Sequence, residues 1–150
     1  PLAPAAIIET QLQKFARAFA EKNISIETQL DSKIRLQADS QRLQQLFSNL
    51  LQNTLLYTNA DGKLIISMQE TEKQVAINWE DSAPTVNEDE INQLFDYFYR
   101  GESSRNRETG GSGLGLAIVK SIVTGHGGDI SASLNNMGGL SLRITFNKML

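Results

Sequence analysis

The sequence predicts an α+β fold in which helices cover one face of an antiparallel-rich sheet. Two long segments, residues 5–22 and 40–57, place apolar side chains at the three- and four-residue spacing of an amphipathic helix. Several short segments instead alternate apolar and polar residues, as half-buried strands do. Most of these short segments follow one another with only a turn between them, which favours hairpins. We therefore expect a two-layer α/β sandwich with a mixed sheet, formed by residues 1–150 as a single domain.

The first predicted helix, residues 5–22, follows Pro4, which suits a first helical turn. Its apolar face consists of Ile8, Leu12, Phe15 and Phe19. Residues 24–30 and 34–38 then alternate apolar and polar side chains on either side of a polar turn at 31–33. This arrangement predicts two short antiparallel strands.

The second predicted helix, residues 40–57, can be capped by Asp39 or Ser40. Its buried face is expected to consist of Leu43, Leu46, Phe47, Leu50, Leu51 and Thr54. Asn49 and Asn53 lie one turn apart at the edge of this face. Because asparagine is unfavourable inside helices, the pair suggests side-chain oxygens directed at a ligand or at Mg²⁺, which prefers oxygen donors. The spacing is equally compatible with two asparagines that face water.

Two hairpins are predicted after this helix. Residues 63–70 and 74–81 alternate apolar and polar side chains around a three-residue turn, and residues 129–134 and 140–146 form a similar pair. Asp81 ends the first hairpin and is followed by a turn. A carboxylate at this place could accept the amino group of a purine; the alternative is an aspartate that caps a turn, which is common.

A glycine-rich loop leads into a third apolar helix. Ten of the eleven glycines lie between Gly101 and Gly139, and helical spacing begins at about Gly113. Glycines let a backbone approach a ligand closely, and a helix start offers unpaired N–H groups that suit phosphate. An anion-binding loop is one interpretation, and a flexible loop before a core helix is the other. The run lacks the Gly-Lys-Ser/Thr of a P-loop, and the polar residues 100–112 before it cannot be the buried strand that a dinucleotide fingerprint requires.

The segments around this loop carry three smaller predictions. Residues 88–96 predict a short helix, and aromatic side chains cluster at its end, at Phe95, Tyr97, Phe98 and Tyr99. Residues 125–128, with three glycines, predict a helix stop. His126 lies within that stop, so we interpret it as a turn or packing residue rather than a catalytic base.

The composition excludes several classes of function. The chain has no cysteine, which removes disulfides, zinc–thiolate sites and thiol catalysis, and its single histidine rules out a His-rich metal cluster. A net charge of −3 argues against a nucleic-acid partner or an anionic membrane surface. No apolar run approaches the ~20 residues of a membrane span. The chain begins with Pro1 rather than Met, so we expect it to be part of a longer protein.

The order of these motifs resembles the N, G1, F and G2 boxes of bacterial sensor histidine kinases, a branch of the GHKL superfamily. The matching segments are Asn49–Asn53, Asp81, residues 95–100 and residues 111–116. The resemblance extends from about Ile8 to Phe146. It implies the catalytic, ATP-binding domain of such a kinase, with the Bergerat fold that gyrase-type and MutL-type ATPases share.

The resemblance implies a role for individual residues by position. Asn53 would coordinate the Mg²⁺ that bridges the ATP phosphates, assisted by Asn49, and Asp81 would bind the adenine amino group. Tyr57 and Arg100 would lie near the phosphates. The backbone N–H groups that would contact the phosphates belong to Gly111, Gly113, Leu114, Gly115 and Leu116. The implied reaction is transfer of the γ-phosphate to a histidine, catalysed by positioning and charge neutralisation, with Asn49, Asn53 and Arg100 as the catalytic side chains.

The resemblance also implies partners and location. The acceptor histidine would lie on a separate dimerisation domain of the same kinase, whose motif is absent from this sequence, so the chain alone would bind Mg-ATP without phosphorylating itself. The parent would be a homodimeric inner-membrane protein of a bacterium, with this domain in the cytoplasm and a response regulator as the next phosphate acceptor. The isolated chain would be a monomer.

Four positions depart from the family pattern. Ala83 and Thr85 replace the two glycines that usually follow the G1 aspartate, and Thr54 and Leu56 replace an alanine and a lysine after the N-box asparagine. These changes slightly favour an alternative reading, a pseudokinase module that binds nucleotide and signals without phosphotransfer. A third possibility is another GHKL ATPase, although the Phe-Tyr-Arg box and the short lid at 101–112 argue against it.

Overall fold

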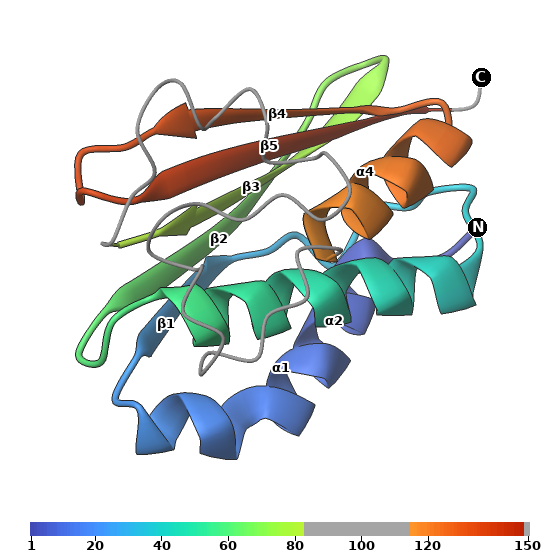
Figure 1. Ribbon diagram of the computed structural model, residues 1–150. Helices are drawn as coiled ribbons and strands as arrows, with labels where there is room; N and C mark the ends of the chain where they lie inside the picture. Colours follow the sequence, from blue (N-terminus) through green and yellow to red (C-terminus); the bar gives the residue numbers. More distant parts are fainter. Residues whose placement is uncertain (83–114, 149–150) are drawn as a thin grey trace.

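The computed structural model describes residues 1–82 and 115–148, which form a five-stranded sheet with helices on one face (Figure 1). The helices are α1 (Pro4–Glu21), α2 (Ser40–Tyr57) and α4 (Gly115–Gly125). The strands are β1 (Ser25–Gln29), β2 (Lys63–Glu70), β3 (Gln74–Asp81), β4 (Asp129–Leu134) and β5 (Leu140–Asn147). Their order across the sheet is β1-β2-β3-β5-β4. The predicted α+β two-layer fold with a mixed sheet is therefore confirmed.

Helix α2 forms where the sequence predicts it, and its start is fixed by a side-chain cap. The carboxylate of Asp39 accepts hydrogen bonds from the backbone N–H groups of Gln41 and Arg42, at 2.9 and 3.2 Å. Asp39, rather than Ser40, is thus the capping residue. All six side chains predicted for its inner face are buried. Helix α2 packs against α1 on one side and α4 on the other, so it is the central element of the helical layer.

The predicted antiparallel pairing of residues 24–30 with 34–38 is wrong. Strand β1 pairs in parallel with β2, with Ser25 opposite Lys63, and α2 forms the crossover between them. Residues 34–38 contribute only an isolated bridge between Leu36 and Leu2. The alternation in this segment reflects the burial of Ile34 and Leu36 in the core, which does not require a strand partner.

The two later hairpins are confirmed. Strands β2 and β3 pair antiparallel, and so do β4 and β5. Strand β5 also pairs antiparallel with β3, with Glu80 opposite Ser141, so the end of β3 lies beside the start of β5. The expected short helix at 88–96 and the aromatic cluster that follows it lie outside the described residues.

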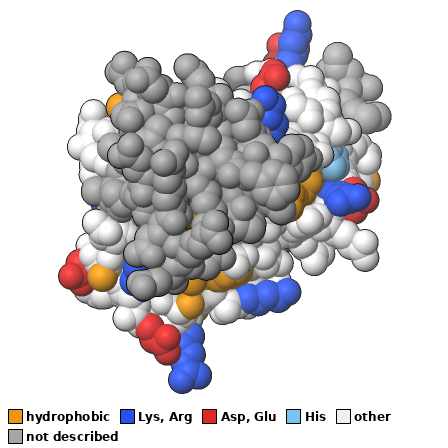
Figure 2. Space-filling view, viewed as in Figure 1, with side chains coloured by type: hydrophobic (Ala, Val, Ile, Leu, Met, Phe, Trp, Pro, Cys, Tyr) orange, Lys and Arg blue, Asp and Glu red, His pale blue; other side chains and the backbone are white. Residues whose placement is uncertain are grey.

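The described surface carries charges of both signs. Figure 2 shows basic and acidic side chains scattered over one face and often next to each other. Within residues 1–82 and 115–148, no helix has the length and apolar character that crossing a membrane would require.

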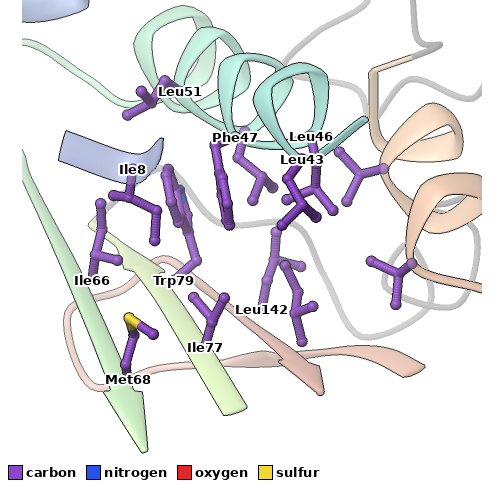
Figure 3. Packing of buried hydrophobic residues seen from close by; sticks show 14 of the residues in the cluster. Ile8, Leu43, Leu46, Phe47, Leu51, Ile66, Met68, Ile77, Trp79 and Leu142 are labelled. Carbon is purple, nitrogen blue, oxygen red and sulfur yellow. The ribbon is translucent and has the colours of Figure 1, made fainter. Parts of the chain in front are cut away.

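Trp79 lies at the centre of the core between the sheet and α2 (Figure 3). Its ring stacks on Phe47 with centroids 6.4 Å apart and planes inclined by 12°. Its Nε1–H donates a hydrogen bond of 3.0 Å to the Oγ1 of Thr54, so the buried indole N–H and the buried hydroxyl satisfy each other. Side chains two residues apart on a strand point to the same face of the sheet. The side chain of Asp81 therefore lies on the same face as that of Trp79, which is the face that the helices cover.

Candidate functional site

Three polar residues on α2 line one side of the helix at a spacing of four residues. Asn49, Asn53 and Tyr57 are all partly buried, beside the buried face that packs on the sheet. The side-chain Nδ2 of Asn49 is buried and has no hydrogen-bond partner among the described residues. A buried polar atom left unpaired is costly, so this position fits a polar ligand. It favours the interpretation of the asparagines as binding residues over the one in which both face water.

The donor set in this region fits Mg²⁺ held largely by a bound nucleotide. No cluster of three or more His, Cys, Asp or Glu side chains suited to a metal occurs in the part of the chain that the structure describes. The amide oxygens of Asn49 and Asn53 are hard oxygen donors on one helical edge. Mg²⁺ commonly takes one or two protein oxygens and completes its shell with phosphate oxygens and water. The asparagine pair is compatible with that mode of binding.

Asp81 is the partly buried carboxylate of the site. Its Oδ1 accepts a hydrogen bond of 3.0 Å from the backbone N–H of Leu140, the first residue of β5. Burial raises the pKa of Asp81 to about 6, while the hydrogen bond from Leu140 acts in the opposite direction. Within the described residues only Oδ1 receives a hydrogen bond. The carboxylate therefore has acceptor capacity left for a ligand, and a perturbed carboxyl group of this kind marks a candidate binding site.

The backbone around Asp81 is closely packed against the β4–β5 loop. A Cβ atom added to Gly139 would lie 2.1 Å from the carbonyl oxygen of Asp81 and 2.5 Å from that of Ser82. Only glycine fits at this place. The contact with the strand that carries Asp81 is thus the structural reason for a glycine at position 139.

Helix α4, which follows the glycine-rich run in the sequence, packs against α2. It begins at Gly115, and its Leu116, Ala117, Val119 and Val123 side chains are buried. Of the predicted phosphate contacts, Gly115 and Leu116 belong to α4, whereas Gly111, Gly113 and Leu114 lie outside the described residues. Arg100, Ala83 and Thr85 also lie outside them.

The structure brings Asn53 and Asp81 into one region of the molecule. Asn53 directly precedes Thr54, which is hydrogen-bonded to Trp79, and Asp81 follows Trp79 by two residues on the same strand face. This hydrogen bond and the stacking of Trp79 on Phe47 therefore hold α2 against β3 close to Asp81. One residue that the sequence did not reveal also touches this region: Asn135 donates a hydrogen bond of 2.8 Å to the backbone carbonyl of Asp81.

His126 is a packing residue, as predicted. Its Nε2 accepts a hydrogen bond of 3.2 Å from the backbone N–H of Asp39, and its Nδ1 lies 2.8 Å from the carbonyl oxygen of Ile122. Nδ1 must therefore carry the proton and donate. The ring also meets Phe146 edge to face, with centroids 6.2 Å apart. His126 thus connects the end of α4 with the cap of α2.

Comparison with known proteins gives a consistent result. A family model described as histidine kinase-, DNA gyrase B- and HSP90-like ATPase matches residues 38–149. The signal transduction histidine-protein kinase BaeS of Escherichia coli (strain K12) is 43% identical over 138 residues, which cover 92% of this chain and 30% of BaeS. The chain thus spans less than a third of that relative.

Solved structures agree with the fold. The nucleotide-free catalytic domain of the histidine kinase ThkA matches with a TM-score of 0.83 and 26% identity, covering 98% of this chain and 95% of that domain. ThkA in complex with the response regulator protein TrrA matches with a TM-score of 0.78 and 24% identity, covering 97% of this chain and 40% of the ThkA chain.

Proposed function

Because the chain belongs to the family of histidine kinase-, DNA gyrase B- and HSP90-like ATPases, we propose that it binds Mg-ATP and donates the γ-phosphate to a histidine on the dimerisation domain of a two-component sensor kinase. The observation that carries this proposal is the partly buried carboxylate of Asp81, held at the end of β3 on the face of the sheet that α2 covers. Its strand is joined through Trp79 and Thr54 to α2, which carries the two asparagines, and this link supports one nucleotide site.

Asp81 is proposed to recognise the base. The exocyclic amino group of adenine donates to the carboxylate, whose Oδ1 is already fixed by the N–H of Leu140. Since the Asp81 carboxylate is partly shielded from water, a hydrogen bond to its ionised form is stronger than one made in water. This contact orients the base and therefore the phosphate chain that extends from it.

The polar edge of α2 and the start of α4 are proposed to hold the phosphates. Asn53, assisted by Asn49, supplies amide oxygen to Mg²⁺, which when bound neutralises charge on the phosphates. Tyr57 continues this edge, and Arg100 is the proposed cationic contact. Backbone N–H groups proposed to bind the phosphates belong to Gly111, Gly113, Leu114, Gly115 and Leu116. The residues of this domain position the phosphoryl group and do not become covalently modified.

The acceptor is proposed to lie on another domain. His126 is engaged through both ring nitrogens and packs on Phe146, so it is unsuited to accept a phosphoryl group. We propose that residues 1–150 form one catalytic domain on the cytoplasmic side of a homodimeric bacterial inner-membrane sensor, and that this domain by itself is a monomer. A response regulator is the proposed next acceptor, by analogy with the ThkA–TrrA complex.

Phosphotransfer to a supplied acceptor tests this function. The chain is incubated with γ-labelled ATP and the dimerisation domain of its own parent protein, and label on the acceptor histidine is measured. Transfer that is lost in Asn53→Ala is the expected result. Nucleotide binding without any transfer would favour a pseudokinase module, for which the replacements Ala83, Thr85 and Leu56 are the motivating observation. Robust ATP hydrolysis by the chain alone would favour another GHKL ATPase.

A further inference from the structure

Asn135 organises the loop that joins β4 to β5. Its side-chain Oδ1 accepts hydrogen bonds from the backbone N–H groups of Met137 and Gly139, at 2.9 and 3.1 Å. Its own backbone N–H donates to the carbonyl of Gly139 at 3.1 Å. An asparagine that collects backbone amides in this way holds a turn in one conformation. The side chain of Asn135 therefore fixes where Gly139 lies.

The same side chain reaches the neighbouring strand. The Nδ2 of Asn135 donates a hydrogen bond of 2.8 Å to the backbone carbonyl of Asp81, a residue 54 positions away in the sequence. One carboxamide thus holds the loop through its oxygen and the end of β3 through its nitrogen. Removing this carboxamide would break the hydrogen bonds to the β4–β5 loop and the hydrogen bond to the end of β3 together.

Gly139 links Asn135 to the carboxylate of Asp81. It packs directly on the carbonyls of Asp81 and Ser82, where a side chain would collide. The next residue, Leu140, donates the N–H that binds the Oδ1 of Asp81 at 3.0 Å. Asn135 therefore acts on Asp81 from two directions, directly on its backbone and through Gly139 and Leu140 on its side chain.

We propose that Asn135 is a positioning residue that holds the Asp81 carboxylate in the orientation needed to accept the adenine amino group. The inference rests on the proposed nucleotide site. It predicts an effect confined to recognition of the base, because the phosphates are assigned to α2, α4 and the glycine-rich run. Asn135 itself touches no part of the nucleotide in this account.

A pair of ligands separates a positioning role from a general structural one. ATP carries the exocyclic amino group, and purine riboside 5′-triphosphate lacks it but is otherwise the same. The ratio of their dissociation constants measures the contact between the amino group and Asp81. A hydrogen bond to a charged group corresponds to a preference for ATP of about tenfold or more. A variant that merely loosens the fold would weaken both ligands equally and leave the ratio unchanged.

The variants are chosen to separate the two contacts of Asn135. Asn135→Ala removes both. Asn135→Asp keeps an acceptor for the loop amides but removes the donor to the Asp81 carbonyl, and it serves if the alanine variant does not fold. Asn136→Ala is the matched control, because Asn136 is an exposed residue of the same type in the same loop.

Calorimetric titration of the wild type and the three variants with both triphosphates decides the matter. We expect the preference for ATP to fall to about threefold or less in Asn135→Ala, to fall partly in Asn135→Asp, and to stay at the wild-type value in Asn136→Ala. Unchanged preference in both Asn135 variants, or equal binding of the two ligands by the wild type, would overturn the inference. A folded wild type that binds neither ligand would overturn the proposed function and this inference with it.

Discussion

The backbone N–H of Leu140 donates a hydrogen bond of 3.0 Å to the Oδ1 of Asp81, so the first residue of β5 holds the carboxylate at the last residue of β3. Strand pairing places these two residues next to each other, since Glu80 is already opposite Ser141. The pairing of β3 with β5 thus fixes the position of this carboxylate. The hydrogen bond from Leu140 offsets only part of the free energy that removing the carboxylate from water costs.

The burial of Asp81 predicts how stability depends on pH. Because its pKa is raised from 3.8 to about 6, the folded protein binds more protons than the unfolded chain between these values. The contribution of Asp81 to the free energy of unfolding is therefore largest below about pH 4 and falls as pH rises through 6. The loss is about 3 kcal/mol, since one pKa unit corresponds to about 1.4 kcal/mol.

Urea unfolding of the wild type and of Asp81→Asn, at intervals from pH 4 to pH 7, measures this contribution. Asparagine keeps an acceptor for the N–H of Leu140 and cannot ionise. We expect the stability difference between the two proteins to shift in favour of the variant as pH rises. Parallel pH profiles would contradict the account of Asp81.

Gly139→Ala tests the close contact between the β4–β5 loop and β3. The added Cβ would lie 2.1 Å from the carbonyl oxygen of Asp81, so the loop or the strand must move. We expect a loss of about 2–4 kcal/mol in the free energy of unfolding. Gly125→Ala is the control, because nothing lies within 4 Å of the atom added there, and it should leave stability unchanged or slightly increased. Equal effects at the two glycines would argue against the contact.

Thr54→Val tests the hydrogen bond between α2 and β3. Valine has nearly the shape of threonine but no hydroxyl, so the Nε1–H of Trp79 would be buried without an acceptor. The expected cost is about 1–3 kcal/mol in chemical denaturation. Thr54→Ser keeps the hydroxyl and loses only a methyl group. A valine variant as stable as the wild type would show that the hydrogen bond does not contribute to holding the two elements together.

His126 is expected to stay unmodified when the chain is incubated with γ-labelled ATP and Mg²⁺. Both of its ring nitrogens are engaged, one by the N–H of Asp39 and the other by the carbonyl of Ile122. Label retained by the wild type under alkaline conditions, and absent from His126→Gln, would contradict this expectation. Such label would also remove the need for an acceptor on another domain.

Much of the helical layer could be predicted from the sequence because its signals are local. The inner face of α2 follows from the spacing of its six buried residues, and its start follows from an aspartate next to the first turn. The β2–β3 and β4–β5 hairpins join strands that are neighbours along the chain, so alternation and a turn are sufficient evidence.

The pairing of β1 and the role of Asn135 could not be predicted because both depend on distant residues. Strand β1 takes a parallel partner on the far side of α2, and alternation does not reveal which strand that will be. In the sequence, Asn135 resembles an ordinary turn residue. Only the structure shows that its Nδ2 donates a hydrogen bond to the backbone carbonyl of Asp81. For the site itself, the motif order singled out Asp81 and the two asparagines, while the contacts of Trp79 with Phe47 and Thr54, which join their two elements, belong to the packed core.

The most direct test of the central claim is calorimetric titration of the chain with ATP, with and without Mg²⁺, beside Asp81→Asn and Asn53→Ala. Our account predicts that binding is lost or weakened at least tenfold in Asp81→Asn. It also predicts that Mg²⁺ strengthens binding by the wild type but not by Asn53→Ala. A folded wild type that does not bind ATP, or that binds it equally well without the Asp81 carboxylate, would contradict the account.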